Sequence, residues 1–228
     1  WRKIAVMTHD VENYDEIFSG TKEVAENLQI DAKKLQPWID ANVPDAGQIK
    51  KIEQFKGGQS NPTYKIITKG KNLVLRRKPP GKLLPSAHAV DREYKVITAL
   101  YETDVPVPRT YGLCEDEDVT GTAFFVMDCL DGDIFWDPML PTLKKEERIQ
   151  IYQNKNKTLA ALHNVDYKKV GLESYGKPGN YVARQVARWS KQYRASETDN
   201  IDAMNNLTEW LPENIPDDDE TSIVHGDY

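Results

Sequence analysis

The sequence predicts an α+β fold in which a small antiparallel sheet is followed by a helix-rich half. Short segments rich in β-branched and aromatic residues, separated by glycine-containing turns, fill the chain from residue 47 to 130. Apolar residues spaced three and four apart, which is typical of helices, dominate from residue 131 to 228. We therefore expect an N-terminal helical extension at 1–46, a sheet-rich lobe with its linker at 47–130, and a helical lobe at 131–228.

The individual elements follow from the same periodicities. A helix is predicted at 31–42, because Leu35, Trp38 and Ile39 fall on one face. Strands are predicted at 49–55, 63–68 and 72–77, then a helix at 86–101, then strands at 111–115 and 122–127. The second half contains predicted helices at 142–163 and 180–195 and a last apolar strand at 222–224.

Composition and charge exclude several classes of function. The 228 residues carry a formal charge of −6 and the sequence pI is about 5.3, which argues against general binding to nucleic acids or membrane surfaces, since the overall field opposes it. No apolar run approaches the roughly 20 residues that cross a bilayer. Cys114 and Cys129 are too few for a disulfide framework. We therefore expect a cytoplasmic protein with no nucleic-acid or membrane partner.

A glycine-rich turn between the first two predicted sheet strands is the first candidate site. Its residues combine backbone freedom with side-chain hydrogen-bonding groups, as anion-binding turns do. They are Gly57, Gly58, Gln59, Ser60 and Asn61. An ordinary hairpin turn is the alternative, because glycine-rich connections between strands are common.

A strand cation and a helix carboxylate form the second candidate. Arg76 lies on the third predicted strand, and Glu93 lies in the first turns of the helix that follows. Kinases pair a strand cation with a helix carboxylate in this order, although they prefer lysine on the strand. Arg77 and Lys78 follow directly, so the sequence leaves open which of the three cations contacts phosphate.

Two further segments complete the pattern. The strand at 122–127 leads into Asp128, Cys129 and Leu130, whose backbone groups are candidates for hydrogen bonds to a purine. A plain core strand is compatible with this interpretation. The last predicted strand delivers His225-Gly-Asp227, a sequence found where a kinase places its catalytic aspartate.

These segments together resemble the aminoglycoside phosphotransferase and choline kinase-like family, and more narrowly the kinase-like module related to the N-terminal domain of some acyl-CoA dehydrogenases. The resemblance spans residues 55–228 and implies a protein-kinase-like two-lobed fold with an incomplete C-lobe. The motifs are Gly57-Gly-Gln-Ser-Asn-Pro-Thr-Tyr64, Leu73-Val-Leu-Arg-Arg77 with Pro79-Pro-Gly81, Leu84-Pro-Ser-Ala-His-Ala-Val-Asp-Arg-Glu-Tyr94, Asp131-Gly-Asp-Ile-Phe-Trp-Asp137, Arg188-Trp-Ser-Lys-Gln-Tyr193 and Val224-His-Gly-Asp-Tyr228.

The resemblance also implies roles for the candidate residues. ATP phosphates would bind at the glycine turn and near Arg76, adenine would bind at 128–130, and Asp227 with His225 would form the catalytic loop. Magnesium ligands are expected beyond residue 228, so no metal ligand is assigned within the chain and full activity is not expected of residues 1–228 alone. Candidate acceptor contacts are Asp133, Trp136, Arg184 and Arg188. For the two arginines a solvated helix face is the alternative.

The function that the sequence favours is an ATP-dependent phosphotransferase acting on a hydroxyl of a small molecule, such as a hydroxyacyl thioester or an aminoglycoside-like acceptor. The alternative is a non-catalytic kinase-like module that binds nucleotide for regulation. Arg76 in place of lysine favours the module, whereas Asp227 favours the enzyme. The choice between ATP and GTP and the oligomeric state stay open at this point.

Overall fold

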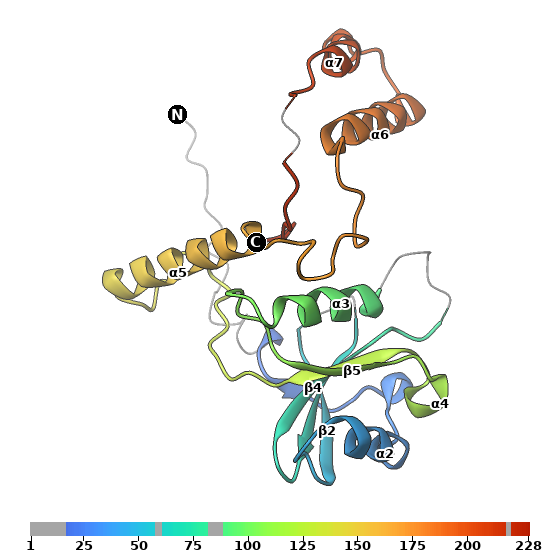
Figure 1. Cartoon of the computed structure of the whole chain (residues 1–228), viewed down its shortest axis with the longest axis vertical. Coiled ribbons are helices and arrows are strands. Elements are labelled where there is room, and N and C mark those ends of the chain that lie inside the picture. The colour runs from blue at the N-terminus through green and yellow to red at the C-terminus, as the bar shows by residue number, and fades with distance from the viewer. Residues whose placement is uncertain (1–16, 58–60, 82–88, 218–219) are drawn as a thin grey trace. The chain divides into compact units, whose positions relative to one another are not determined.

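The chain divides into two units, Trp1–Thr158 and Leu159–Tyr228, and each is described by itself. The computed structural model describes residues 17–57, 61–81, 89–217 and 220–228. A sheet with two covering helices makes up most of the described part of the first unit (Figure 1). The second unit is helical, and helix α5 (Lys145–His163) begins in the first unit and ends in the second.

The first unit is built on a six-stranded antiparallel sheet with the order β1-β2-β3-β4-β6-β5. The strands β2, β3 and β4 have the bounds that the sequence predicts, and β5 and β6 differ by one or two residues. The strands are β1 (Thr21–Lys22), β2 (Ile49–Phe55), β3 (Thr63–Thr68), β4 (Asn72–Arg77), β5 (Thr110–Cys114) and β6 (Phe124–Asp128). The predicted α+β class is confirmed.

One face of the sheet packs on helix α2 (Ala32–Asn42), which begins at Asp31, whose carboxylate accepts a hydrogen bond from the Lys33 amide at 2.8 Å. The short turn η1 (Glu26–Leu28) precedes this helix, and α4 (Glu117–Thr120) lies between β5 and β6. The Trp38 ring meets the Phe124 ring edge-on at 5.0 Å. The fully buried side chains of this layer are Leu35, Ile39, Tyr64, Ile66, Leu73, Leu75, Phe124 and Val126.

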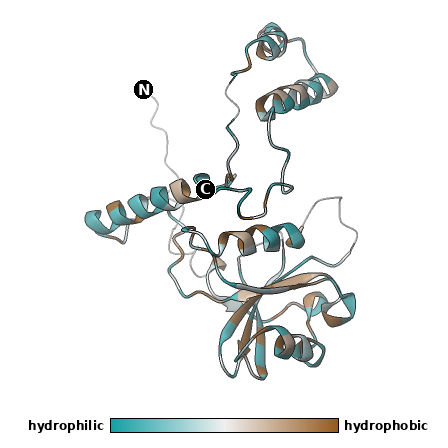
Figure 2. Cartoon of the chain, viewed as in Figure 1, coloured by the Kyte–Doolittle hydropathy of each residue, from teal (hydrophilic) through white to brown (hydrophobic). Residues whose placement is uncertain are grey.

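The opposite face of the sheet carries helix α3 (Val90–Leu100), so the sheet lies between two helices (Figure 1). Tyr94 of α3 approaches Phe125 of β6 with ring centroids 6.0 Å apart. Because side chains alternate along a strand, Phe125 points to α3 while its neighbour Phe124 points to α2. The hydropathy colours show the same arrangement, with the apolar residues concentrated in the sheet strands and a mostly polar α5 (Figure 2).

The second unit contains helix α6 (Tyr181–Ser196) and helix α7 (Asp202–Glu213). Helix α6 corresponds to the helix predicted at 180–195, whereas α7 has no predicted counterpart. Residues 222–224, predicted as a strand, are not paired with any described strand and have no regular secondary structure. A strand needs a partner to satisfy its backbone groups, so apolar character alone did not suffice here. Within the described residues we find no helix with the length and apolar character needed to cross a membrane.

Candidate functional site

Arg76 and Glu93, the predicted strand cation and helix carboxylate, are in direct contact. Arg76 Nε donates to Glu93 Oε2 at 2.6 Å, and Arg76 Nη2 donates to Glu93 Oε1 at 3.1 Å. This is the bidentate geometry that a guanidinium forms with a carboxylate. The side chains are 27% and 34% exposed, so the pair is accessible to a ligand. Glu93 lies in the first turn of α3, where the helix dipole favours a negative charge.

Asn61 and Thr63 extend this pair into a network of four residues. The Asn61 amide donates to Glu93 Oε1 at 2.9 Å, and Arg76 Nη1 donates to the Thr63 hydroxyl at 3.1 Å. The Thr63 hydroxyl in turn donates to the Asn61 carbonyl at 3.1 Å. Asn61, predicted to bind the nucleotide, is only 4% exposed, and its side-chain amide donates to Glu93. Thr63 was missed, although its position directly across from Arg76 in the sheet was a usable signal.

Arg77 has a different environment from Arg76, because adjacent strand residues point to opposite faces. It is 4% exposed and donates to the carbonyls of Thr120 at 2.7 Å and Leu28 at 3.1 Å. Its guanidinium also lies over the Tyr64 ring, 5.3 Å from the centroid. Of the two arginines, Arg76 is therefore the one that faces the helix carboxylate, and Arg77 is committed to buried carbonyls.

The linker segment begins at Asp128, the last residue of β6. Its backbone amide donates to the Arg109 carbonyl at 2.9 Å, and its carboxylate accepts a hydrogen bond from the Tyr111 hydroxyl at 2.6 Å. The Asp128 amide is thus already used within the sheet, which leaves the backbone groups of Cys129 and Leu130 as the better candidates for a purine. Burial raises the pKa of the Cys129 thiol, so it stays neutral. Leu130 is exposed.

Tyr111 supports a prediction about pH. Burial, and then the hydrogen bond to Asp128, raise the pKa of the Tyr111 phenol to about 12, above its ordinary value near 10. A phenol whose pKa is raised on folding stabilises the folded state fully below pH 10, and this contribution is lost as pH rises towards 12. The stability difference between the native chain and Tyr111→Phe should therefore be constant from pH 7 to 9 and shrink above pH 10. Urea unfolding at several pH values measures it; a difference that grows above pH 10 would contradict the assignment.

The glycine turn begins where the structure describes Gly57. An added Cβ on Gly57 would lie 3.3 Å from the Phe18 carbonyl oxygen, a close approach that favours glycine at this position. Gly58, Gln59 and Ser60 of the predicted phosphate turn lie outside the described residues. The structure therefore describes only the two ends of this turn, Gly57 and Asn61.

His225 and Asp227 lie in the second unit and are exposed. The Asp227 backbone amide donates to His225 Nδ1 at 3.2 Å, and the His225 and Tyr228 rings meet at 5.8 Å and 74°. These contacts fold the end of the segment into a turn whose Asp227 carboxylate faces solvent. His225 is thereby placed to orient the aspartate backbone.

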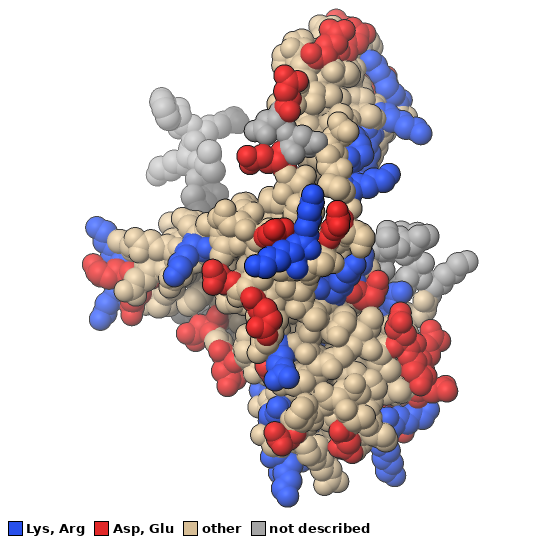
Figure 3. All heavy atoms as spheres, in the orientation of Figure 1, with Lys and Arg blue, Asp and Glu red and all other residues tan. Residues whose placement is uncertain are grey.

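The four predicted acceptor residues differ in their surroundings. Asp133 is exposed, and the Trp136 indole donates to the Ser19 hydroxyl at 2.8 Å. Arg184 donates to the carbonyls of Gly179 and Lys177, so it holds the start of α6. Arg188 lies over the Trp189 ring at 5.5 Å. Basic side chains gather along α6, whereas both signs of charge interleave over the first unit in this view (Figure 3).

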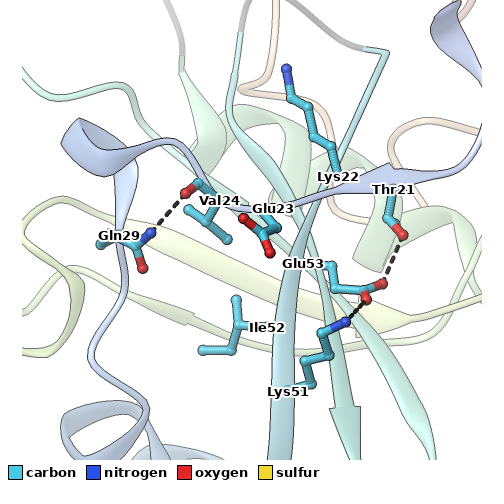
Figure 4. A pocket seen from close by; sticks show the side chains of 8 residues that line it. All are labelled: Thr21, Lys22, Glu23, Val24, Gln29, Lys51, Ile52 and Glu53. Atoms are coloured by element: carbon cyan, nitrogen blue, oxygen red, sulfur yellow. Dashed lines mark hydrogen bonds and ion pairs between the residues drawn. The ribbon is translucent and has the colours of Figure 1, made fainter.

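A polar hollow of about 480 Å³ lies at the β1 edge of the sheet (Figure 4). Two of its charges are paired with each other: Lys51 contacts Glu53 at 2.6 Å, and Thr21 also donates to Glu53 at 2.7 Å. The hydrogen bonds from Lys51 and Thr21 hold the Glu53 pKa below its ordinary value. Its lining includes none of the predicted site residues, so it is distinct from the Arg76 network.

In the ranges that the structure describes, no three acidic, histidine or cysteine side chains come together in a way that would hold a metal ion.

Comparison with known sequences places these features in a family. The family model described as "Phosphotransferase enzyme family" matches residues 51–228. Acyl-CoA dehydrogenase family member 10 of Mus musculus is 49% identical over 211 residues, which cover 92% of this chain and 20% of that protein. Family member 11 of Homo sapiens is 40% identical over 218 residues, covering 92% of this chain and 28% of that protein. The chain thus spans a fifth to just over a quarter of these relatives.

Solved structures agree with this match. A candidate aminoglycoside phosphotransferase from Ralstonia eutropha JMP134 superimposes with a TM-score of 0.76 at 48% identity, covering 88% of this chain and 59% of that one. The GDP complex of aminoglycoside 2'-phosphotransferase-IIIa superimposes with a TM-score of 0.52 at 15% identity and covers 81% of this chain and 59% of its own, so it shows a shared fold. Because the family model covers well over half of the sequence, the chain belongs to the phosphotransferase enzyme family.

Proposed function

We propose that the chain is the nucleotide-binding and catalytic-loop part of an ATP-dependent kinase that phosphorylates a hydroxyl group of a small molecule. The observation that carries the proposal is the bidentate Arg76–Glu93 pair, with 2.6 and 3.1 Å contacts. In kinases the equivalent cation orients the nucleotide phosphates only when a helix carboxylate holds it. Two of the arginine's five N–H donors reach Glu93 and one reaches Thr63, which leaves donors for phosphate oxygens.

The proposed reaction is a direct transfer of the γ-phosphoryl group. The acceptor oxygen forms a bond to the γ-phosphorus while the bond from that phosphorus to the β,γ-bridging oxygen breaks, which releases ADP. The acceptor hydroxyl proton goes to the Asp227 carboxylate, which is exposed and therefore able to receive it. Magnesium would neutralise phosphate charge when bound, and it enters only through the family resemblance, because the described residues offer no such site.

For the acceptor we propose a hydroxyacyl thioester in preference to an aminoglycoside. The relatives named as acyl-CoA dehydrogenase family members support this choice, as does an apolar hollow of about 420 Å³ beside the start of α5. Met139 and Ile149 supply apolar surface for an acyl chain, and Lys145 and Arg148 supply cations for the phosphates of coenzyme A. Cys114 and Cys129 are free thiols, which fits the cytoplasmic location proposed from the sequence.

The test is phosphoryl transfer by the full-length protein from γ-labelled ATP, in the presence of magnesium, to matched panels of hydroxyacyl-CoA esters and aminoglycosides. We expect label on the hydroxyacyl esters, with the corresponding esters that lack a hydroxyl as unlabelled controls. A parallel thermal-shift titration with ATP should raise the melting temperature, because a ligand that binds only the folded state stabilises it. A shift without transfer would favour the non-catalytic module, and no shift with any nucleotide would contradict both functions.

A further inference from the structure

Three residues that are far apart in the sequence form one contact cluster in the first unit. Trp136 comes from the loop that follows β6, and Phe18 and Ser19 precede β1. The Trp136 Nε1 donates to Ser19 Oγ at 2.8 Å across a separation of 117 residues. The Phe18 and Trp136 rings pack with their centroids 5.2 Å apart and a tilt of 44°. We call these three residues the aromatic bridge.

The aromatic bridge lies directly against the start of the glycine turn. An ideal Cβ on Gly57 would be 3.3 Å from the Phe18 carbonyl oxygen and 3.8 Å from Cη2 of Trp136. The next residues of the same N-terminal segment are bonded to the end of β2, because the Lys56 amide donates to the Gly20 carbonyl at 3.1 Å and Thr21 pairs with Phe55. The start of the turn, at Lys56 and Gly57, is therefore held by residues 18–21.

The other end of the aromatic bridge lies in the loop that follows the linker. Trp136 lies eight residues after Asp128, whose backbone and carboxylate are both hydrogen-bonded to the sheet. The bridge thus joins the start of the phosphate turn to the loop that leads on from the purine linker. Trp136 remains 40% exposed, and its indole N–H is already donated to Ser19.

We propose that Trp136 is a positioning residue, which fixes the start of the glycine turn to the loop that follows the linker through Phe18 and Ser19 and thereby sets nucleotide affinity. As far as the nucleotide is concerned, this rests on the proposed function. Preorganising a binding loop raises affinity, since less conformational freedom is lost when the ligand binds. The N-terminal segment 17–22 therefore has a role in the site although it contributes no ligand of its own.

The first test needs no nucleotide and follows amide hydrogen exchange. In Trp136→Ala the Lys56 amide should exchange about tenfold faster than in the native chain, because one hydrogen bond and one aromatic pair are lost. Trp136→Phe and Ser19→Ala should each give a smaller increase. The double variant Trp136→Phe with Ser19→Ala should show the same Lys56 exchange rate as either of these single variants, because both substitutions remove the same hydrogen bond. The matched control is Trp210→Phe, which replaces an exposed tryptophan of the second unit and should leave the Lys56 exchange rate unchanged.

The second test is calorimetric titration of the same proteins with ATP and magnesium. The Kd for ATP should rise about tenfold in Trp136→Ala. Trp136→Phe keeps the ring contact, so it should retain most of the affinity for ATP. An unchanged exchange rate of the Lys56 amide in Trp136→Ala would contradict the proposal that the aromatic bridge positions the start of the turn. Faster exchange with unchanged ATP affinity would overturn its effect on the nucleotide. If the native chain binds no ATP, the proposed function fails, whereas the exchange result still decides whether the bridge positions the turn.

Discussion

Replacing Asp227 with asparagine is expected to slow phosphoryl transfer by about 100-fold to 10,000-fold, which is the usual contribution of a general base. Asparagine has almost the same shape as aspartate, but it cannot accept the acceptor hydroxyl proton. The Asp227 backbone amide would still donate to His225 Nδ1, so the turn should be retained. The measurement is the rate of transfer from labelled ATP by the full-length protein at saturating acceptor, together with the melting temperature.

The matched control for this substitution is Asp217→Asn, which removes one exposed negative charge from the same unit. It should leave both the rate and the melting temperature unchanged, because isolated surface charges contribute little. If Asp227→Asn kept the native rate, Asp227 would have to be withdrawn as the base. A fall in melting temperature would instead assign it a structural role.

Arg77→Met should destabilise the chain by about 3 kcal/mol, because charged hydrogen bonds to the carbonyls of Thr120 and Leu28 are lost. The Leu28 carbonyl keeps the hydrogen bond from the Tyr64 hydroxyl, so most of the cost falls on the buried Thr120 carbonyl. The contact with the Tyr64 ring is lost as well. For a protein of this size the melting temperature should fall by roughly 6–12 °C. Urea unfolding and thermal melting both measure this effect.

Arg76→Met is the matched control, since it removes the same side chain from the neighbouring position of β4. Arg76 is partly exposed, so the loss of stability should stay within about 1 kcal/mol. ATP binding should be lost from Arg76→Met and retained by the fraction of Arg77→Met that is folded. Equal stability of the two variants would contradict the division of roles between the arginines.

Much of the sheet could be predicted from the local sequence, because apolar and polar residues alternate along a strand that buries one face. The strands β2, β3 and β4 have their predicted bounds, and the contact of Arg76 with Glu93 was predicted from their order along the chain. The two-residue strand β1 is too short to show any period. Helix α7 did carry a signal in Met204, Leu207 and Leu211, spaced three and four apart, but its polar residues and Pro212 obscured it.

The contacts that sequence reasoning missed depend on tertiary proximity. Nothing in the spacing of Ser19 and Trp136 indicates that they share a hydrogen bond. Asn61 was assigned to phosphate from its residue type, and only the fold reveals that its amide is bonded to Glu93. The roles of the site residues in binding and catalysis stay predictions, whereas the structure gives the contacts that the described site residues make.

The register of β4 in the sheet also determines which of its two adjacent arginines faces Glu93. A slip of β4 by one residue against β3 and β6 would exchange the faces of Arg76 and Arg77. In one direction Arg76 would take the place of the buried Leu75 in the apolar layer, and in the other Leu75 would take the place of Arg76 opposite Glu93. A misregistered sheet would therefore be unstable, so this sequence disfavours a well-folded state that lacks the arrangement of Arg76 with Glu93.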